Sequence, residues 1–192
     1  EMLRSLVGSE MCIRDRVYIL CGKVASGKTT LATRLAKKGA MVLSCDELML
    51  TLFDHCLGPQ LQRETESRAL RFLQQQAAAL YSLGVDAVLD HGFWYREDRQ
   101  RALAYFRGQN IPAVLYHVTA PQEVRLARLA RRNEQLQGST RREYVMTPDM
   151  LTRFDTWFEP LLPVEQAVKI ETGQEETTYC DGKESTGGNP KP

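Results

Sequence analysis

The stretch CGKVASGKTT at residues 21–30 constrains the fold of this chain more than any other part of its sequence. It matches the pattern G-x-x-x-x-G-K-[ST], in which glycines let successive backbone N–H groups turn toward a phosphate. The pattern has this meaning only between a strand and a helix. The apolar run at 16–21 and the helically spaced run at 29–38 provide that setting. We therefore expect the chain to begin with a strand, a phosphate-binding loop (P-loop) and a helix.

Each position of the loop has a mechanical role in binding a nucleotide. Lys28 is expected to reach the β- and γ-phosphates, and the Thr29 hydroxyl is expected to bind Mg²⁺. The positive end of the following helix faces the same anion. The residues predicted to contact the nucleotide are Gly22, Lys23, Val24, Ala25, Ser26, Gly27, Lys28, Thr29 and Thr30. The loop thus predicts ATP and Mg²⁺ as cofactors, and the alternative is an ordinary glycine-rich turn between a strand and a helix.

Strand-like and helix-like runs alternate along the rest of the chain. Further strands are expected at 40–44, 85–90, 112–119 and 166–172, and helices at 45–53, 61–84, 95–110, 121–133 and 147–160. Such alternation predicts an α/β fold, a parallel sheet with helices on both faces. Ligands of these sheets bind beyond the carboxyl ends of the strands. Polar residues just past the strand ends are therefore the site candidates.

The two ends of the chain are expected to lie outside the domain, which we place at residues 16–172. Residues 6–15, LVGSEMCIRD, resemble the translation of a sequencing-library adapter, so residues 1–15 are interpreted as an artefact. Residues 173–192 are polar and poor in apolar side chains, which predicts a disordered tail.

Charge and cysteine content exclude several classes of protein. The net charge of +1 argues against a general nucleic-acid binder, which would be clearly basic. The five cysteines include no C-x-x-C pair, and their odd number predicts neither a disulfide framework nor a zinc site. No run approaches the roughly 18 apolar residues of a membrane span. A cytoplasmic protein that acts on small molecules fits these limits best.

Two aspartates follow strand ends and carry the predicted chemistry. Asp46 comes after the strand at 40–44 and is assigned as general base, because a carboxylate near the γ-phosphate can take the proton of a substrate hydroxyl. The alternative is that Asp46 caps the next helix. Asp90 ends the strand at 85–90 and is predicted to hold Mg²⁺ together with Thr29. Its alternative is a carboxylate that bonds backbone in a turn.

The segment HGFWYRE at 91–97 follows Asp90 immediately. His91, Phe93 and Trp94 are predicted to line a pocket for the phosphate acceptor. Anchoring of the two aromatic rings in the core is an equally good interpretation. A lone histidine is also more often a hydrogen-bonded surface residue than a substrate contact.

Arginines are concentrated in the run RLARLARRN, where Arg128 and Arg132 are one helical turn apart. The polar segment at 134–146 is predicted to form a mobile lid, and it contains Arg141 and Arg142. Beside a P-loop and a lid, Arg128 and Arg132 are predicted to stabilise charge on a transferred phosphoryl group. The alternative is a solvated helix face.

Four segments together give the chain a family resemblance: the P-loop, SCDELM, LDHGFWYREDR, and the run from RLARLARRN through TPDMLTRFDTWFEP. In this order they resemble the small P-loop kinases of the zeta-toxin and chloramphenicol-phosphotransferase type, in the bacterial branch labelled only ATP-binding protein or AAA family ATPase. The resemblance covers residues 16–172. It implies an adenylate-kinase-like, three-layer core with sheet order 2-3-1-4-5 and an arginine-bearing lid. It also implies ATP, Mg²⁺ and phosphoryl transfer to a hydroxyl.

Carried over residue by residue, the resemblance implies that Lys28 and Thr29 hold phosphate and metal and that Asp46 is the catalytic carboxylate. Arg128 and Arg132 match the lid-side arginines. The predicted protein is an ATP-dependent kinase acting on an alcohol group of a small molecule, with some ATP hydrolysis. Two other functions stay open: a polynucleotide 5′-hydroxyl kinase, and a nucleotide-binding regulatory switch without transfer activity. The acceptor does not follow from the resemblance, because relatives phosphorylate chemically different molecules.

Overall fold

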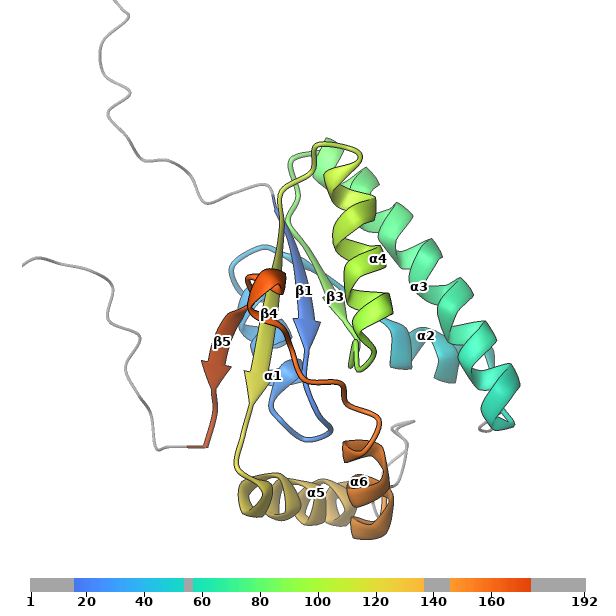
Figure 1. Cartoon of the computed structure of the whole chain (residues 1–192), viewed down its shortest axis with the longest axis vertical. Helices are drawn as coiled ribbons and strands as arrows, with labels where there is room; N and C mark the ends of the chain where they lie inside the picture. Colours follow the sequence, from blue (N-terminus) through green and yellow to red (C-terminus); the bar gives the residue numbers. More distant parts are fainter. Residues whose placement is uncertain (1–15, 54–56, 137–145, 174–192) are drawn as a thin grey trace, which may run out of the picture.

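The computed structural model describes residues 16–53, 57–136 and 146–173 (Figure 1). The predictions made for residues 1–15 and 174–192, and for Arg141 and Arg142, lie outside these residues and stay predictions. The strands are β1 (Val17–Cys21), β2 (Met41–Ser44), β3 (Ala87–Asp90), β4 (Ala113–Thr119) and β5 (Val168–Glu171). The helices are α1 (Lys28–Ala36), α2 (Cys45–Leu52), α3 (Pro59–Ser82), α4 (Arg96–Arg107), α5 (Gln122–Leu136) and α6 (Pro148–Asp155), with a short 3₁₀ helix η1 (Pro163–Glu165).

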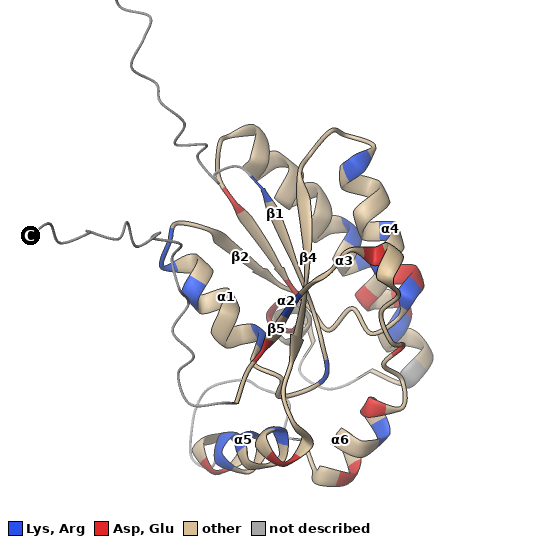
Figure 2. Cartoon of the chain, turned by 60° about the vertical axis from the view of Figure 1, so that its left-hand side comes forward, with Lys and Arg blue, Asp and Glu red and all other residues tan. Residues whose placement is uncertain are grey.

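The five strands form one parallel sheet in the order β2-β3-β1-β4-β5, which confirms the predicted fold class. β1 lies in the middle, where Val17 is in register with Ala87 of β3 and with Ala113 of β4. Figures 1 and 2 show α3 and α4 on one face of the sheet and α1 on the other. α5 and α6 lie beyond the carboxyl ends of the strands, next to the loop that leaves β1. The region beyond the carboxyl ends of the strands, where the P-loop begins, is therefore bordered by α5 and α6.

The alternating side chains of β1 supply both halves of the core. Val17 and Ile19 pack with the apolar sides of α3 and α4, including Phe106. Tyr18 and Leu20 pack toward α1 on the opposite face. A strand covered by helices on both faces needs apolar residues at every position, which explains the uninterrupted run VYILC.

A third apolar cluster attaches the P-loop to α5 and α6. Val24 of the loop is buried with Leu129 of α5 and Leu151 of α6. α5 extends to Leu136, so the first residues of the segment expected to be a lid are helical. On the far side of the undescribed residues 137–145, the Met146 carbonyl accepts a hydrogen bond from Asn133 Nδ2 at 2.6 Å. The last turn of α5 and the start of α6 are thereby held together.

Helix caps rule out the alternative considered for Asp46, that it caps α2. The cap of α2 is Ser44, whose Oγ accepts from the Glu47 amide at 3.2 Å, and not Asp46. The cap of α6 is Thr147, with Pro148 in the first turn. One charged residue of α4, Arg99, has an entirely buried side chain.

α4, α5 and α6 each carry charges of both signs (Figure 2). None of the helices in the described part combines the length and apolar character that crossing a membrane requires.

Candidate active site

The P-loop connects β1 to α1, and side chains of the loop itself and of the surrounding protein donate hydrogen bonds to its carbonyl oxygens. The pairs are Lys28 Nζ with Gly22 O and Lys23 O (both 2.9 Å), Trp94 Nε1 with Gly22 O (3.2 Å), Arg125 Nη1 with Val24 O (3.4 Å), Arg128 Nη1 with Ala25 O (3.3 Å) and Thr172 Oγ1 with Ser26 O (2.7 Å). In a trans peptide the carbonyl and the following N–H point in opposite directions. Arg125, Arg128 and Thr172 hold the Val24, Ala25 and Ser26 carbonyls outward, toward the surrounding protein, so the amides that follow these carbonyls point inward. Within the described residues, two of these amides, those of Ala25 and Gly27, have no hydrogen-bond acceptor.

Three properties of this loop fit a phosphate. A Cβ at Gly22 would lie 2.2 Å from the Val118 carbonyl, so only glycine fits this close approach. Ser26 Oγ is buried and, among the described residues, has no hydrogen-bond partner. Lys28 Nζ donates two hydrogen bonds to backbone carbonyls, which leaves one of its three ammonium protons for a ligand. Inward amides, an orphaned hydroxyl and a spare ammonium proton all require an acceptor-rich group, and phosphate oxygens supply one.

Burial lowers the pKa of Lys28, while the nearby carboxylates of Asp90 and Asp46 act in the opposite direction. An ammonium group that has lost part of its hydration gains more from an incoming anion than a hydrated one does. This electrostatic setting favours a strongly charged ligand at the loop.

Thr29 and Asp90 form the predicted metal half-site. Thr29 Oγ1 donates to Asp90 Oδ2 at 3.3 Å, across the gap between α1 and the end of β3. Burial raises the pKa of Asp90, against the opposing charge of Lys28. In the described part of the chain no three His, Cys, Asp or Glu side chains gather as a metal cage. One hydroxyl and one carboxylate fit Mg²⁺, which completes its shell with phosphate oxygens and water.

Asp46 faces the same centre from the start of α2. Because Ser44 supplies the helix cap, the Asp46 carboxylate is not used for capping. Water reaches this side chain, yet the protein around it removes enough hydration to raise its pKa. The charges of Lys28 and Arg132 act in the opposite direction, which places both cations near the carboxylate. A carboxylate with a raised pKa between two cations suits proton acceptance.

The two predicted lid-side arginines occupy different positions. Arg128 Nη1 contacts the outer side of the P-loop and also Thr172 Oγ1, at 2.8 Å. Arg132 instead acts electrostatically on both Asp46 and Lys28. Arg132 thus acts on the predicted catalytic carboxylate, whereas Arg128 contacts the loop backbone, and the catalytic roles of both arginines stay predictions.

The residues after β3 mainly anchor their own loop. Phe93 is 0% exposed within the core, and it borders a cavity between α3 and α4 that contains no P-loop residue. The Trp94 ring packs against Phe154 at 5.5 Å. Both rings thus fit the anchoring interpretation, and Phe93 presents no surface to an acceptor in this structure. His91 contacts the Phe93 ring edge-on, and its buried Nδ1 has no hydrogen-bond partner among the described residues.

His91 lies in an environment that keeps it neutral. Burial lowers its pKa to about 4, and the charge of Lys28 acts in the same direction. Thr30, the last predicted loop contact, is exposed at the start of α1. A neutral His91 with a free ring nitrogen remains available for a hydrogen bond to a ligand hydroxyl.

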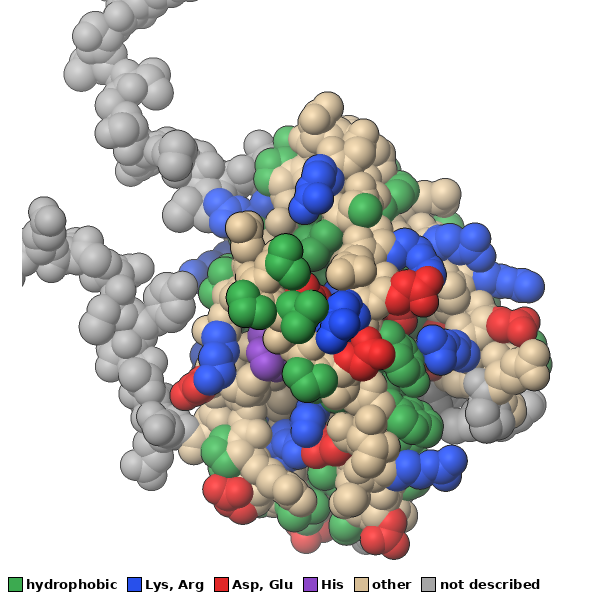
Figure 3. Space-filling view, viewed as in Figure 1, with side chains coloured by type: hydrophobic (Ala, Val, Ile, Leu, Met, Phe, Trp, Pro, Cys, Tyr) green, Lys and Arg blue, Asp and Glu red, His purple; other side chains and the backbone are tan. Residues whose placement is uncertain are grey.

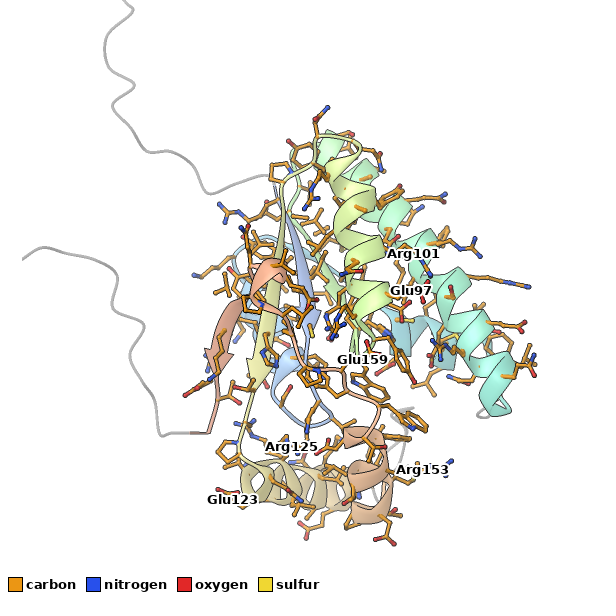
Figure 4. The ribbon with its side chains drawn as sticks, in the orientation of Figure 1. Glu97, Arg101, Glu123, Arg125, Arg153 and Glu159 are labelled. Atoms are coloured by element: carbon orange, nitrogen blue, oxygen red, sulfur yellow. The ribbon has the colours of Figure 1, made fainter. Side chains whose placement is uncertain are left out.

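Sequence analysis missed two ion pairs that support the site. Arg99 Nε and Nη2 meet the Glu165 carboxylate at 2.6 and 3.2 Å, and Arg99 Nη1 donates to the Phe93 and Trp94 carbonyls. Arg125 forms a bidentate ion pair with Asp155. Figure 4 shows Arg125 rising from α5 toward the P-loop. No local pattern marks either pair, because the partners come from segments far apart in the sequence.

The sheet order, the P-loop and the Thr29–Asp90 pair define a P-loop protein of the three-layer α/β class. A family model described as an AAA domain matches residues 17–155, and the chain belongs to this family. No curated protein matches the sequence significantly.

Solved structures share the fold. A sugar kinase from Janibacter sp. HTCC2649 is 21% identical, with 81% of this chain and 84% of that chain covered and a TM-score of 0.56. A protein from Chloroflexus aurantiacus provisionally described as a kinase is 21% identical, with coverages of 83% and 86% and a TM-score of 0.62. Kti12 from Chaetomium thermophilum, in complex with ADP-AlF3, is 14% identical, with coverages of 83% and 90% and a TM-score of 0.58. The narrower resemblance to zeta-toxin and chloramphenicol-phosphotransferase kinases stays a prediction.

Proposed function

We propose that this protein is an ATP-dependent kinase that transfers the γ-phosphate of Mg-ATP to a hydroxyl group of a small molecule. The observation that carries this proposal is the position of Asp46. Its carboxylate is released from helix capping, has a raised pKa and lies near Lys28 and Arg132. A P-loop protein that only binds and releases nucleotide has no acceptor proton to remove, so it needs no such carboxylate.

Each proposed role follows from a group already described. The inward amides and the remaining Lys28 proton bind the phosphates, and Thr29 with Asp90 holds Mg²⁺. When bound, Mg²⁺ neutralises charge on the β- and γ-phosphate oxygens. Asp46 takes the acceptor proton as the acceptor oxygen bonds to phosphorus and the bond to the leaving diphosphate oxygen breaks. Arg132 offsets charge on the transferred group, and His91 and Trp94 are the remaining candidates for the acceptor side.

Charge distribution favours a small acceptor over a polynucleotide. On the face shown in Figure 3, basic and acidic side chains are interspersed and no extended basic surface is seen. A polynucleotide kinase relies on phosphate contacts along its substrate, which require clustered arginines and lysines. The sugar kinase among the structural neighbours is in keeping with a small acceptor.

The test uses γ-labelled ATP, Mg²⁺ and a fractionated bacterial metabolite extract, with wild type beside Asp46→Asn. We expect label to move to a small molecule, and the transfer rate to fall by roughly 10²–10⁴ in Asp46→Asn, as for loss of a general base. Glu47→Gln is the matched control, because it removes the same charge from the adjacent exposed residue. Its transfer rate should stay near that of wild type.

Other outcomes separate the alternatives. ATP binding without any labelled product, from metabolites or from RNA with a free 5′-hydroxyl, would favour the regulatory switch. Labelled RNA would favour the polynucleotide kinase. Lys28→Ala should abolish turnover, and ordinary activity in that variant would refute the P-loop assignment itself.

A further inference from the structure

The outward carbonyls of the P-loop are not held by the loop's own residues alone. Val24 O depends on Arg125 of α5, whose side chain is almost completely buried. A guanidinium in such a position keeps its orientation only if a partner neutralises it and occupies its other N–H groups. The residue that neutralises Arg125 therefore determines the position of the guanidinium that donates to the Val24 carbonyl.

That partner is Asp155, at the end of α6. Its Oδ1 accepts from Arg125 Nη1 at 2.8 Å and its Oδ2 from Arg125 Nη2 at 2.5 Å. Asp155 Oδ2 also accepts from Lys23 Nζ at 3.4 Å, so one carboxylate contacts the loop on two routes. Burial acts to raise the Asp155 pKa, but the hydrogen bonds and charges of Arg125 and Lys23 prevail and lower it. The carboxylate is therefore ionised at neutral pH.

We propose that Asp155 is a positioning residue for nucleotide binding, which acts through Arg125 and Lys23 to hold the Val24 peptide with its carbonyl outward. This inference rests on the proposed function. Asp155 touches no nucleotide itself. Its effect passes through the peptide between Val24 and Ala25, because the Ala25 amide points inward only while the Val24 carbonyl stays outward.

The test is the dissociation constant for Mg-ATP, measured by calorimetry, in Asp155→Asn. We expect binding to weaken about tenfold or more, as for loss of a charge-assisted hydrogen-bonded pair. The matched control is Asp149→Asn, which removes the same charge from an exposed position in the first turn of the same helix. Its dissociation constant should equal that of wild type.

A mutant cycle with Arg125→Met tests the route. If Asp155 acts through Arg125, the double variant binds no more weakly than the weaker single variant. The double variant also leaves no unpaired buried charge, so it folds even if Asp155→Asn alone does not. The two tryptophans of the chain, Trp94 and Trp157, pack 6.1 Å apart beside this network. Their emission should change on ATP binding in wild type and less in the variants.

Wild-type affinity in Asp155→Asn or in the double variant, or losses that simply add, would overturn the positioning role. The Lys28→Ala variant distinguishes a failure of the positioning role from a failure of the proposed function. If Lys28→Ala binds ATP as wild type does, the P-loop assignment is wrong. If Lys28→Ala loses binding while the Asp155 variants keep it, only the positioning role is wrong.

Discussion

The buried pair of Arg99 and Glu165 invites a single-atom change, Glu165→Gln. The Arg99 side chain is 0% exposed and that of Glu165 2%, so neither charge has water as an alternative partner. Glutamine keeps the size of glutamate and one acceptor oxygen. Its NH₂ group, however, would face a guanidinium N–H or the Leu162 amide, which now donates to Glu165 Oε2 at 2.7 Å. Arg99 would keep its full charge without a counter-ion.

Removing one partner of a buried ion pair costs about 3–5 kcal/mol, because the remaining charge stays desolvated. Whole domains are stable by only about 5–15 kcal/mol, so the loss is a large fraction of the total. For a chain of this length, about 1 kcal/mol shifts the melting temperature by about 2–4 °C, which predicts a fall of roughly 6–20 °C. Urea unfolding followed by circular dichroism should show a lower midpoint with an unchanged slope.

The second arm of the experiment replaces both partners, as Arg99→Met with Glu165→Leu. Because no lone charge remains, this variant should be clearly more stable than the sum of its single substitutions predicts. Acid provides a further check. The Arg99 charge and hydrogen bonds hold the Glu165 pKa below its ordinary value despite burial. The pair thus stabilises above about pH 4.3 and is lost as pH falls through the lowered pKa. Glu165→Gln should lose less stability than wild type over that range.

A loss below about 1 kcal/mol in Glu165→Gln would place the pair in the range of exposed ion pairs and refute the reasoning. Additive losses in the double variant would do the same.

The His91 pKa is about 4, so between about pH 6.5 and 4 His91 takes up a proton only in the unfolded chain. The free energy of unfolding should therefore decrease as the pH falls through this range. His91→Gln should remove roughly 3 kcal/mol of this pH dependence, measured by urea unfolding at several pH values. Because the pKa of Asp46 is raised, kcat/KM should increase with pH through an apparent pKa above the ordinary aspartate value of about 3.9. An apparent pKa at or below that value in the acidic part of the pH profile would contradict the general-base role. Gly22→Ala should abolish nucleotide binding through its clash with the Val118 carbonyl. Gly39→Ala, which shares a positive φ but meets open space, should cost only about 1–2 kcal/mol in unfolding free energy and leave binding intact.

Local patterns sufficed for the elements of this fold. The apolar run VYILC of β1 and the strand–loop–helix setting of the P-loop can be recognised from residues that are close in the sequence. The ends of the elements were less certain. Asp46 was considered as a cap for α2, and only the observed bond from Glu47 N to Ser44 Oγ shows that Ser44 is the cap instead. That distinction matters because it leaves Asp46 available for chemistry.

The supporting shell of the site was beyond sequence reasoning. In YREDRQR, Arg99 has the same neighbours as a solvated helix residue, and its partner Glu165 lies 66 positions away. Arg125 belongs to a run whose other arginines were expected to face a phosphoryl group, yet it is neutralised by Asp155, 30 positions away. A guanidinium that supports backbone and one that contacts substrate look alike until the tertiary partner is known.

The bond from Thr172 to Ser26 spans 146 positions of the chain. At a synthesis rate of about 5–20 residues per second, roughly 7–30 s separate the appearance of Ser26 from that of Thr172 on the ribosome. β3 is complete only at Asp90 and β4 only at Thr119, so β1 lacks at least one of its two neighbours for more than half of this interval. The nascent P-loop therefore has no scaffold that would turn its amides inward, and ATP in the cell cannot stabilise the first half of the chain. The P-loop is synthesised before the other strands of the sheet, yet its hydrogen bonds are completed only when Thr172 has emerged.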